Sequence, residues 1–176
     1  MNIKEYLKQL GELTLQHYIS LESVKTLIED MPSTNKVILL GNGGSASIAA
    51  HVATDLTNAA NIRAVNFSES SLITCLSNDY GYENWMSTAL HMYAKEGDIL
   101  ILISSSGNSE NIIRAGKYWQ GKGPIVTFSG FDYSNKLNNL DMTYKFWVDS
   151  KTYNHIEMVH HIWLVALVDM LNGVIS

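Results

Sequence analysis

The chain of 176 residues has the length of one domain with a full-sized core, and we predict a single domain over residues 1–176. Its net charge of −5 at pH 7 argues against a nucleic-acid partner, because broad phosphate contact needs clustered Lys and Arg. The single cysteine, Cys75, excludes an internal disulfide, and we expect it to be a buried small residue.

No apolar run approaches the roughly 20 residues that span a bilayer, and no basic stretch followed by an apolar one opens the sequence. We therefore expect a cytoplasmic protein with no membrane partner.

Helical spacing of apolar residues predicts one long amphipathic helix over 3–28, and apolar runs predict strands alternating with helices after it. The strands are expected at 36–40, 63–67, 98–104, 124–129 and 145–149, and the helices around His51 and at 69–76, 82–94, 110–120 and 154–171. The run 99–103 is apolar throughout, which is typical of a central strand. The order predicts an α/β fold with a doubly wound parallel sheet, which binds ligands at the carboxyl ends of its strands.

The segment Gly41-Asn42-Gly43-Gly44-Ser45 joins the first predicted strand to a helix and has the chemistry of an anion site. Its glycines allow positive φ and close approach of a ligand, and the helix start offers free N–H groups. It matches neither GxGxxG nor the Gly-Lys-Ser/Thr ending of a P-loop, so we expect no nucleotide. A smaller phosphorylated ligand fits better.

A second polar turn, Ser104 to Ser109, follows the central strand. Serine and asparagine also favour ordinary helix caps, but four hydroxyls around a glycine at a strand end favour a phosphate site.

Histidines and carboxylates recur at helical spacing near the first turn and in the last helix. His51 and Asp55 are i, i+4 neighbours, as are Glu157 and His161, and His160 lies beside the latter. The first pair could be only a surface hydrogen bond. Together, the two sets could form a zinc-type metal site or an acid/base set.

The last helix is apolar almost all round, and we expect it and the N-terminal helix to pack against partner subunits of a homo-oligomer.

Three motifs then resemble the phosphoheptose isomerases of the sugar isomerase (SIS) fold, a flavodoxin-like sandwich. They are Gly41-Asn-Gly-Gly-Ser-Ala46 with His51, Ser77-Asn-Asp-Tyr-Gly-Tyr-Glu83, and Ile103-Ser-Ser-Ser-Gly-Asn-Ser109. The resemblance spans essentially the whole chain. It implies a homotetramer that isomerises sedoheptulose 7-phosphate to D-glycero-D-manno-heptose 7-phosphate for bacterial surface sugars.

The resemblance also implies roles for single residues. The phosphate would be bound by Ser104, Ser105, Ser106 and Ser109, and the sugar by Asn42, Gly43 and Ser45 with Asp79 near its hydroxyls.

In the family, a histidine and a glutamate on the first helix and a glutamine and a histidine on the last surround a zinc ion. The matching positions here are His51, Asp55, Glu157 and Val165, and an arginine of the family falls on Ala59. Because valine cannot bind a metal, His161, one turn earlier, is the expected fourth ligand, and His160, at i+3 from Glu157, is the other candidate.

By this resemblance, Asp55 is the base of an enediol mechanism and His160 or His161 the acid. Two alternatives stay open: an isomerase of a related sugar phosphate, and a non-catalytic SIS module that binds sugar phosphates or a replication initiator.

Overall fold

Five apolar segments form one parallel sheet in the computed structural model, which describes residues 2–175 except the side chains of Tyr18 and Ile19. The sheet order is β2-β1-β3-β4-β5, and every neighbouring pair is parallel. The strands are β1 (Val37–Gly41), β2 (Ala64–Asn66), β3 (Ile99–Ile103), β4 (Ile125–Ser129) and β5 (Tyr144–Trp147). The predicted doubly wound sheet and its central strand are confirmed.

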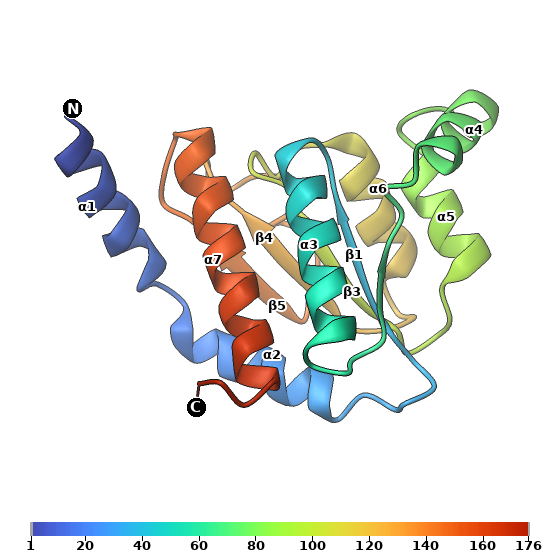
Figure 1. The fold of residues 1–176 in the computed structure, drawn as a ribbon. Coiled ribbons are helices and arrows are strands. Elements are labelled where there is room, and N and C mark those ends of the chain that lie inside the picture. Colours follow the sequence, from blue (N-terminus) through green and yellow to red (C-terminus); the bar gives the residue numbers. More distant parts are fainter. Residues whose placement is uncertain (1, 176) are drawn as a thin grey trace.

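Helices cover both faces of the sheet (Figure 1). One face carries α2 (Tyr18–Glu29), α3 (Gly44–Asn58) and α7 (Tyr153–Leu171), and the other carries α4 (Ser70–Tyr80), α5 (Trp85–Tyr93) and α6 (Glu110–Trp119). The remaining helix, α1 (Ile3–Thr14), lies beside α7 at the edge of the molecule. Each face has its own apolar core, because side chains of β1, β3 and β4 alternate between the two faces. No helix among the described residues is long and apolar enough to cross a membrane.

The single N-terminal helix predicted over 3–28 is wrong, because the structure has two helices separated at His17. The backbone of His17 has φ +58°, and its ring lies edge-on against Phe146 and Trp163. Trp163 Nε1 also donates to the carbonyl of Thr14, a group left free at the end of α1. Tertiary contacts therefore end the first helix, although residues 15–17, where it breaks, include no proline or glycine.

Two smaller expectations also need correction. The helix expected at 69–76 runs further in the structure: α4 continues to Tyr80, and Gly81, with φ +87°, is its C-cap. Cys75 is exposed on that helix rather than buried. Because α4 packs only a few of its residues into the core, most of its side chains face solvent.

The buried carboxylate of Asp98 connects the amino-terminal ends of two strands, at the edge of the sheet opposite the polar loops. Asp98 accepts hydrogen bonds from the backbone N–H groups of Lys36 and Lys95, from Asn35 Nδ2 and from Lys36 Nζ at 2.7 Å. Burial alone would raise the pKa of Asp98, but these hydrogen bonds outweigh it and leave the pKa below its usual value. The carboxylate thus ties the start of β1 to the start of β3.

The chain leaves β1 and β3 in opposite directions. The loop after β1 leads into α3 on one face, and the loop after β3 leads into α6 on the other. Since the two strands are neighbours, a crevice opens between their carboxyl ends, which is where ligands bind in sheets of this order.

Candidate active site

The glycine loop after β1 brings two helices together. Gly43, with φ +54°, directly precedes α3, and a Cβ atom at Gly41 would lie 2.5 Å from the backbone of Ser45. A Cβ atom at Gly44 would collide with the carboxylate of Glu157 from α7. The glycines therefore permit the tight turn and let α7 approach the N-terminal end of α3.

The serine loop after β3 is held by its own turn. Gly107, at φ +63°, donates its N–H to the carbonyl of Ser104, and the hydroxyls of Ser104 and Ser109 lie 3.4 Å apart. Ser109 is the residue before α6, and in the described structure its hydroxyl caps none of that helix's N–H groups. The free donors at the start of α6 therefore face the same space as the serine hydroxyls.

Between the two loops lies a cavity of about 170 Å³, which we call the serine pocket. Its lining residues are Asn42, Ser45, Ile103, Ser104, Ser105, Ser106, Ser109, Tyr153 and Glu157. The N-terminal ends of α3, α6 and α7 all lie at this edge of the sheet (Figure 1). The pocket thus combines hydroxyls with the positive ends of helices.

A buried hydroxyl in this pocket has no protein partner. Ser105 is 6 % exposed, and its Oγ makes no hydrogen bond to any described residue. Leaving such a group unpaired costs about 1–3 kcal/mol, a cost that a ligand oxygen would remove. The lining residues that the structure describes include no Lys or Arg, so an anion would be bound here by neutral donors.

Next to the pocket, three side chains form a line across α3 and α7, which we call the imidazole chain. Asp55 Oδ2 lies 3.0 Å from His51 Nε2, and His51 Nδ1 lies 2.8 Å from His161 Nε2. Because an ionised Asp55 accepts from His51 Nε2, a neutral His51 accepts at Nδ1 from the Nε2–H of His161. A proton can therefore pass along the line between His161 and Asp55.

The environment of His161 lowers its pKa and so favours the neutral imidazole in the free protein. Partial burial lowers its pKa, the neighbouring His51 lowers it further, and Asp55 acts in the opposite direction. Glu157 lies one turn earlier on the same face of α7, so a carboxylate separates the imidazole chain from the serine pocket.

The chemistry of these donors suits zinc, which binds imidazole nitrogens and carboxylate oxygens. Over residues 2–175, however, the His, Cys, Asp and Glu side chains form no group of three or more around one point. A metal bound by His51 and His161 would replace the hydrogen bond between them.

The structure does not bring His160 to the site. His160 is fully buried, donates from Nε2 to the carbonyl of Ser129 and lies edge-on against Phe128. Burial lowers its pKa to about 4, and the hydrogen bond that it donates to the Ser129 carbonyl opposes this shift. Of the two candidate acids, only His161 meets the imidazole chain.

Two further expected residues lie outside the residues described as lining the pocket. Asp79 is exposed near the end of α4, where its carboxylate faces Cys75 and Asn78. Gly43 is exposed at the rim of the glycine loop.

The pocket also contains residues that the sequence patterns did not indicate. Tyr153, the first residue of α7, lines the pocket and packs on Phe131 with ring centroids 4.7 Å apart. Tyr82 and Asn111 bond to the side chain of Asn42. Asn111 lies two residues after Ser109, a proximity that could have indicated it; nothing in the sequence indicated Tyr153.

Comparison with known proteins agrees with this arrangement. The family model described as SIS domain matches residues 3–127. A phosphoheptose isomerase of Proteus mirabilis is 34% identical over 173 residues, which cover 85% of this chain and 90% of that protein. One from Cytophaga hutchinsonii is 32% identical over 154 residues, covering 82% and 81%. The chain belongs to the phosphoheptose isomerase family.

A solved structure supports the same assignment. Phosphoheptose isomerase GmhA from Neisseria gonorrhoeae superimposes with a TM-score of 0.86 at 26% identity, covering 96% of this chain and 94% of that one.

The three motifs that this chain shares with the phosphoheptose isomerase family lie close together in the fold. Two are the loops of the serine pocket, and the third ends α4 and reaches the glycine loop through Tyr82. Val165 is partly buried and packs against the core, so it is a packing residue of α7.

The buried His160 predicts a pH dependence of stability. Its folded pKa of about 4 lies below the value of 6.5 expected in the unfolded chain, so only the unfolded chain binds the proton between these values. The free energy of unfolding should therefore fall by about 3 kcal/mol as the pH decreases from 7 to 4. Urea unfolding of wild type and His160→Gln measures this, since Gln can donate to Ser129 without titrating.

His91→Gln, an exposed change, is the matched control and should keep the wild-type slope. The same slope in His160→Gln and wild type would show that His160 does not titrate in this range.

Proposed function

We propose that this protein is an aldose–ketose isomerase that converts sedoheptulose 7-phosphate to D-glycero-D-manno-heptose 7-phosphate, a precursor of bacterial surface sugars. The observation that carries the proposal is the serine pocket, with its unpaired Ser105 hydroxyl, next to the imidazole chain. A phosphate site and a proton-transfer set side by side are what isomerisation of a sugar phosphate requires.

Binding would begin at the phosphate. The hydroxyls of Ser104, Ser105, Ser106 and Ser109 and the N-terminal end of α6 would bind it, and the open sugar chain would extend past Asn42 and Ser45. This anchors the first two carbons near Glu157 and the imidazole chain.

Proton transfer would then interconvert ketose and aldose. Asp55 removes a proton from C1, and the electron pair of that C–H bond forms the C1–C2 double bond. The C2 oxygen takes a proton from His161, which has to be in its protonated, imidazolium form for this step. In the second half, His161 takes the O1 proton, the C1 oxygen becomes the carbonyl, and C2 takes the proton back from Asp55, so that both residues regain their starting protonation states.

His51 would connect these two groups. Its two nitrogens lie at hydrogen-bond distance from Asp55 and from His161, so it would hold the carboxylate and the imidazole in fixed positions relative to each other. In the family resemblance the second histidine falls on Val165, and His161 takes its place on α7 here.

The base is tested by changing Asp55 to Asn, which keeps the shape and removes the proton acceptor. We expect kcat to fall roughly 10³-fold while the affinity for inorganic phosphate stays within about twofold. The assay incubates the enzyme with sedoheptulose 7-phosphate in deuterated water and follows deuterium at C2 and the aldose product by NMR.

Asp30→Asn, an exposed change at the end of α2, is the control and should turn over normally. Full activity in Asp55→Asn would rule out the proposed base. No exchange in the wild type would instead favour another sugar phosphate or a binding module without catalysis.

We further propose that the site binds a transition metal such as zinc through His51 and His161, with Asp55 and Glu157 as oxygen donors. The types of these four donors and the facing nitrogens of the two histidines support this. When bound, the metal would stabilise negative charge on the sugar oxygens.

Zinc binding is measured by calorimetry on chelator-treated protein. We expect about one ion per chain in the wild type and at least tenfold weaker binding in His161→Ala, because one imidazole ligand is lost. His91→Ala is the control; equal affinity in both variants and the wild type would place the metal elsewhere.

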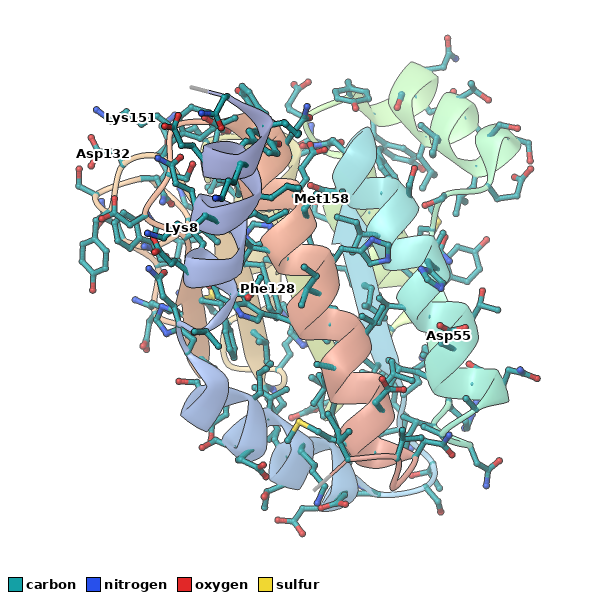
Figure 2. All side chains as sticks on the ribbon, turned by 60° about the vertical axis from the view of Figure 1, so that its left-hand side comes forward. Lys8, Asp55, Phe128, Asp132, Lys151 and Met158 are labelled. Atoms are coloured by element: carbon teal, nitrogen blue, oxygen red, sulfur yellow. The ribbon has the colours of Figure 1, made fainter. Side chains whose placement is uncertain are left out.

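We also propose that the protein is a homo-oligomer, and by the family resemblance a tetramer. Apolar side chains stay exposed on α7, at Met158 (41 %) and Ile162 (42 %), and on α1, at Ile3 (72 %) and Leu7 (58 %). Figure 2 shows Met158 on the outer side of α7, away from the sheet. Exposed apolar pairs at i, i+4 spacing are typical of helix faces that pack on another subunit.

Sedimentation velocity tests this assembly. The wild type should sediment as an oligomer, and Ile162→Lys should shift it toward smaller species, because the change places a charge in an apolar contact. Glu22→Lys, at an exposed position of α2, should leave the distribution unchanged. A monomeric wild type would contradict the proposal.

A further inference from the structure

Two asparagine side chains from different loops pair with each other beside the serine pocket. Asn42 Nδ2 donates to Asn111 Oδ1, and Asn111 Nδ2 donates to Asn42 Oδ1, both at 2.9 Å. Asn42 belongs to the glycine loop and lines the pocket, whereas Asn111 lies in the first turn of α6 and is 3 % exposed. The pair therefore links the two loops across the crevice between β1 and β3.

A backbone group fixes which way both amides face. The N–H of Ile112 lies 3.0 Å from the Oδ1 of Asn111. Because a backbone N–H can only donate, that atom must be the oxygen, and Asn111 must turn its Nδ2 toward Asn42. Asn42 in turn must place its oxygen opposite that donor.

Tyr82 uses the remaining acceptor capacity of Asn42. Its hydroxyl donates to Asn42 Oδ1 at 3.1 Å, so this oxygen accepts from both Tyr82 and Asn111. A carboxamide oxygen has two lone pairs and its nitrogen two hydrogens, of which Asn111 takes one. Among the described residues, one hydrogen of Asn42 Nδ2 is therefore left without a hydrogen-bond partner. Asn42 lines the pocket, so this N–H is available to a ligand there.

We propose that Asn111, assisted by Tyr82, is a positioning residue that orients Asn42 so that its free N–H donates to an oxygen of the bound sugar. Asn42 then recognises an acceptor, a hydroxyl or carbonyl oxygen of the sugar chain, rather than a donor. This inference rests on the part of the proposed function that places a sugar phosphate in the serine pocket, and it does not depend on isomerisation.

The pairing also excludes a different orientation of Asn42. Turning its amide by 180° would place Nδ2 against Asn111 Nδ2 and against Tyr82, and would leave two donors facing each other in a part-buried position. Such a mismatch is costly away from water, so the buried Asn111 selects one orientation.

The test is a double-mutant cycle on binding, with glucitol 6-phosphate as the sugar probe and inorganic phosphate as the second probe. Glucitol 6-phosphate has no carbonyl and cannot be isomerised, so its affinity reports binding alone. We expect Asn42→Ala and Asn111→Ala each to weaken it about tenfold while the affinity for inorganic phosphate stays within about twofold.

If Asn111 acts through Asn42, the double variant binds glucitol 6-phosphate no more weakly than Asn42→Ala does. A double variant about a hundredfold weaker than wild type would overturn the proposal, because the two effects would then be independent. An equal loss of affinity for both probes in Asn111→Ala would also overturn it, because that result indicates a general disturbance of α6.

Tyr82→Phe tests the same orientation without changing a buried residue, since Tyr82 is exposed. It should weaken glucitol 6-phosphate binding about threefold in the wild-type background and leave it unchanged in Asn42→Ala. Tyr93→Phe, an exposed tyrosine of α5, is the matched control. A loss in Tyr82→Phe that persists in Asn42→Ala would contradict the proposal.

These outcomes remain distinct from failure of the proposed isomerase. Absence of deuterium exchange with sedoheptulose 7-phosphate would remove the reaction, but the binding cycle would still decide whether Asn111 orients Asn42.

Discussion

The neighbouring position of β1 and β3 is the constraint on which the site depends. Both strands end at the same edge of the sheet, and their following helices lie on opposite faces, so the two loops diverge and leave a crevice. The buried Asp98 holds the other ends of these strands in register through Lys36. A shift of one strand against the other would separate the glycine loop from the serine loop and break the Asn42–Asn111 pair.

In the proposed function, the pocket would bind an anion by dipoles rather than by opposite charges. The protein carries a net charge of −5, and the described lining of the pocket offers hydroxyls, amide groups and helix ends together with the carboxylate of Glu157. Neutral donors fixed by the fold need no reorganisation when the ligand arrives, whereas flexible lysines would lose side-chain freedom. The carboxylate of Glu157 would repel a bound phosphate and so favour a position of that group near the serine loop, away from α7.

The strands and both polar loops could be predicted because their signals are local: apolar runs, glycines and serines at strand ends. The break at His17 could not, because it depends on Trp163 and on the backbone of Trp147, which are distant in sequence. The same holds for Asn111, whose role follows from the approach of two loops. The last helix has apolar residues on every side, so its sequence does not indicate which face packs against α3. His160 and His161 were therefore equivalent candidates in the sequence.

The buried histidine resolves that choice through helix geometry. His160 donates to the carbonyl of Ser129 at the end of β4, and together with the buried apolar side chains of the same helix this bond sets the rotation of α7 about its axis. Successive residues of a helix point about 100° apart, so a helix held by His160 must turn His161 toward a different neighbour. That neighbour is His51 on α3. The core contact of one histidine therefore determines the position of the next one in the site, and a neutral His160 is needed for both.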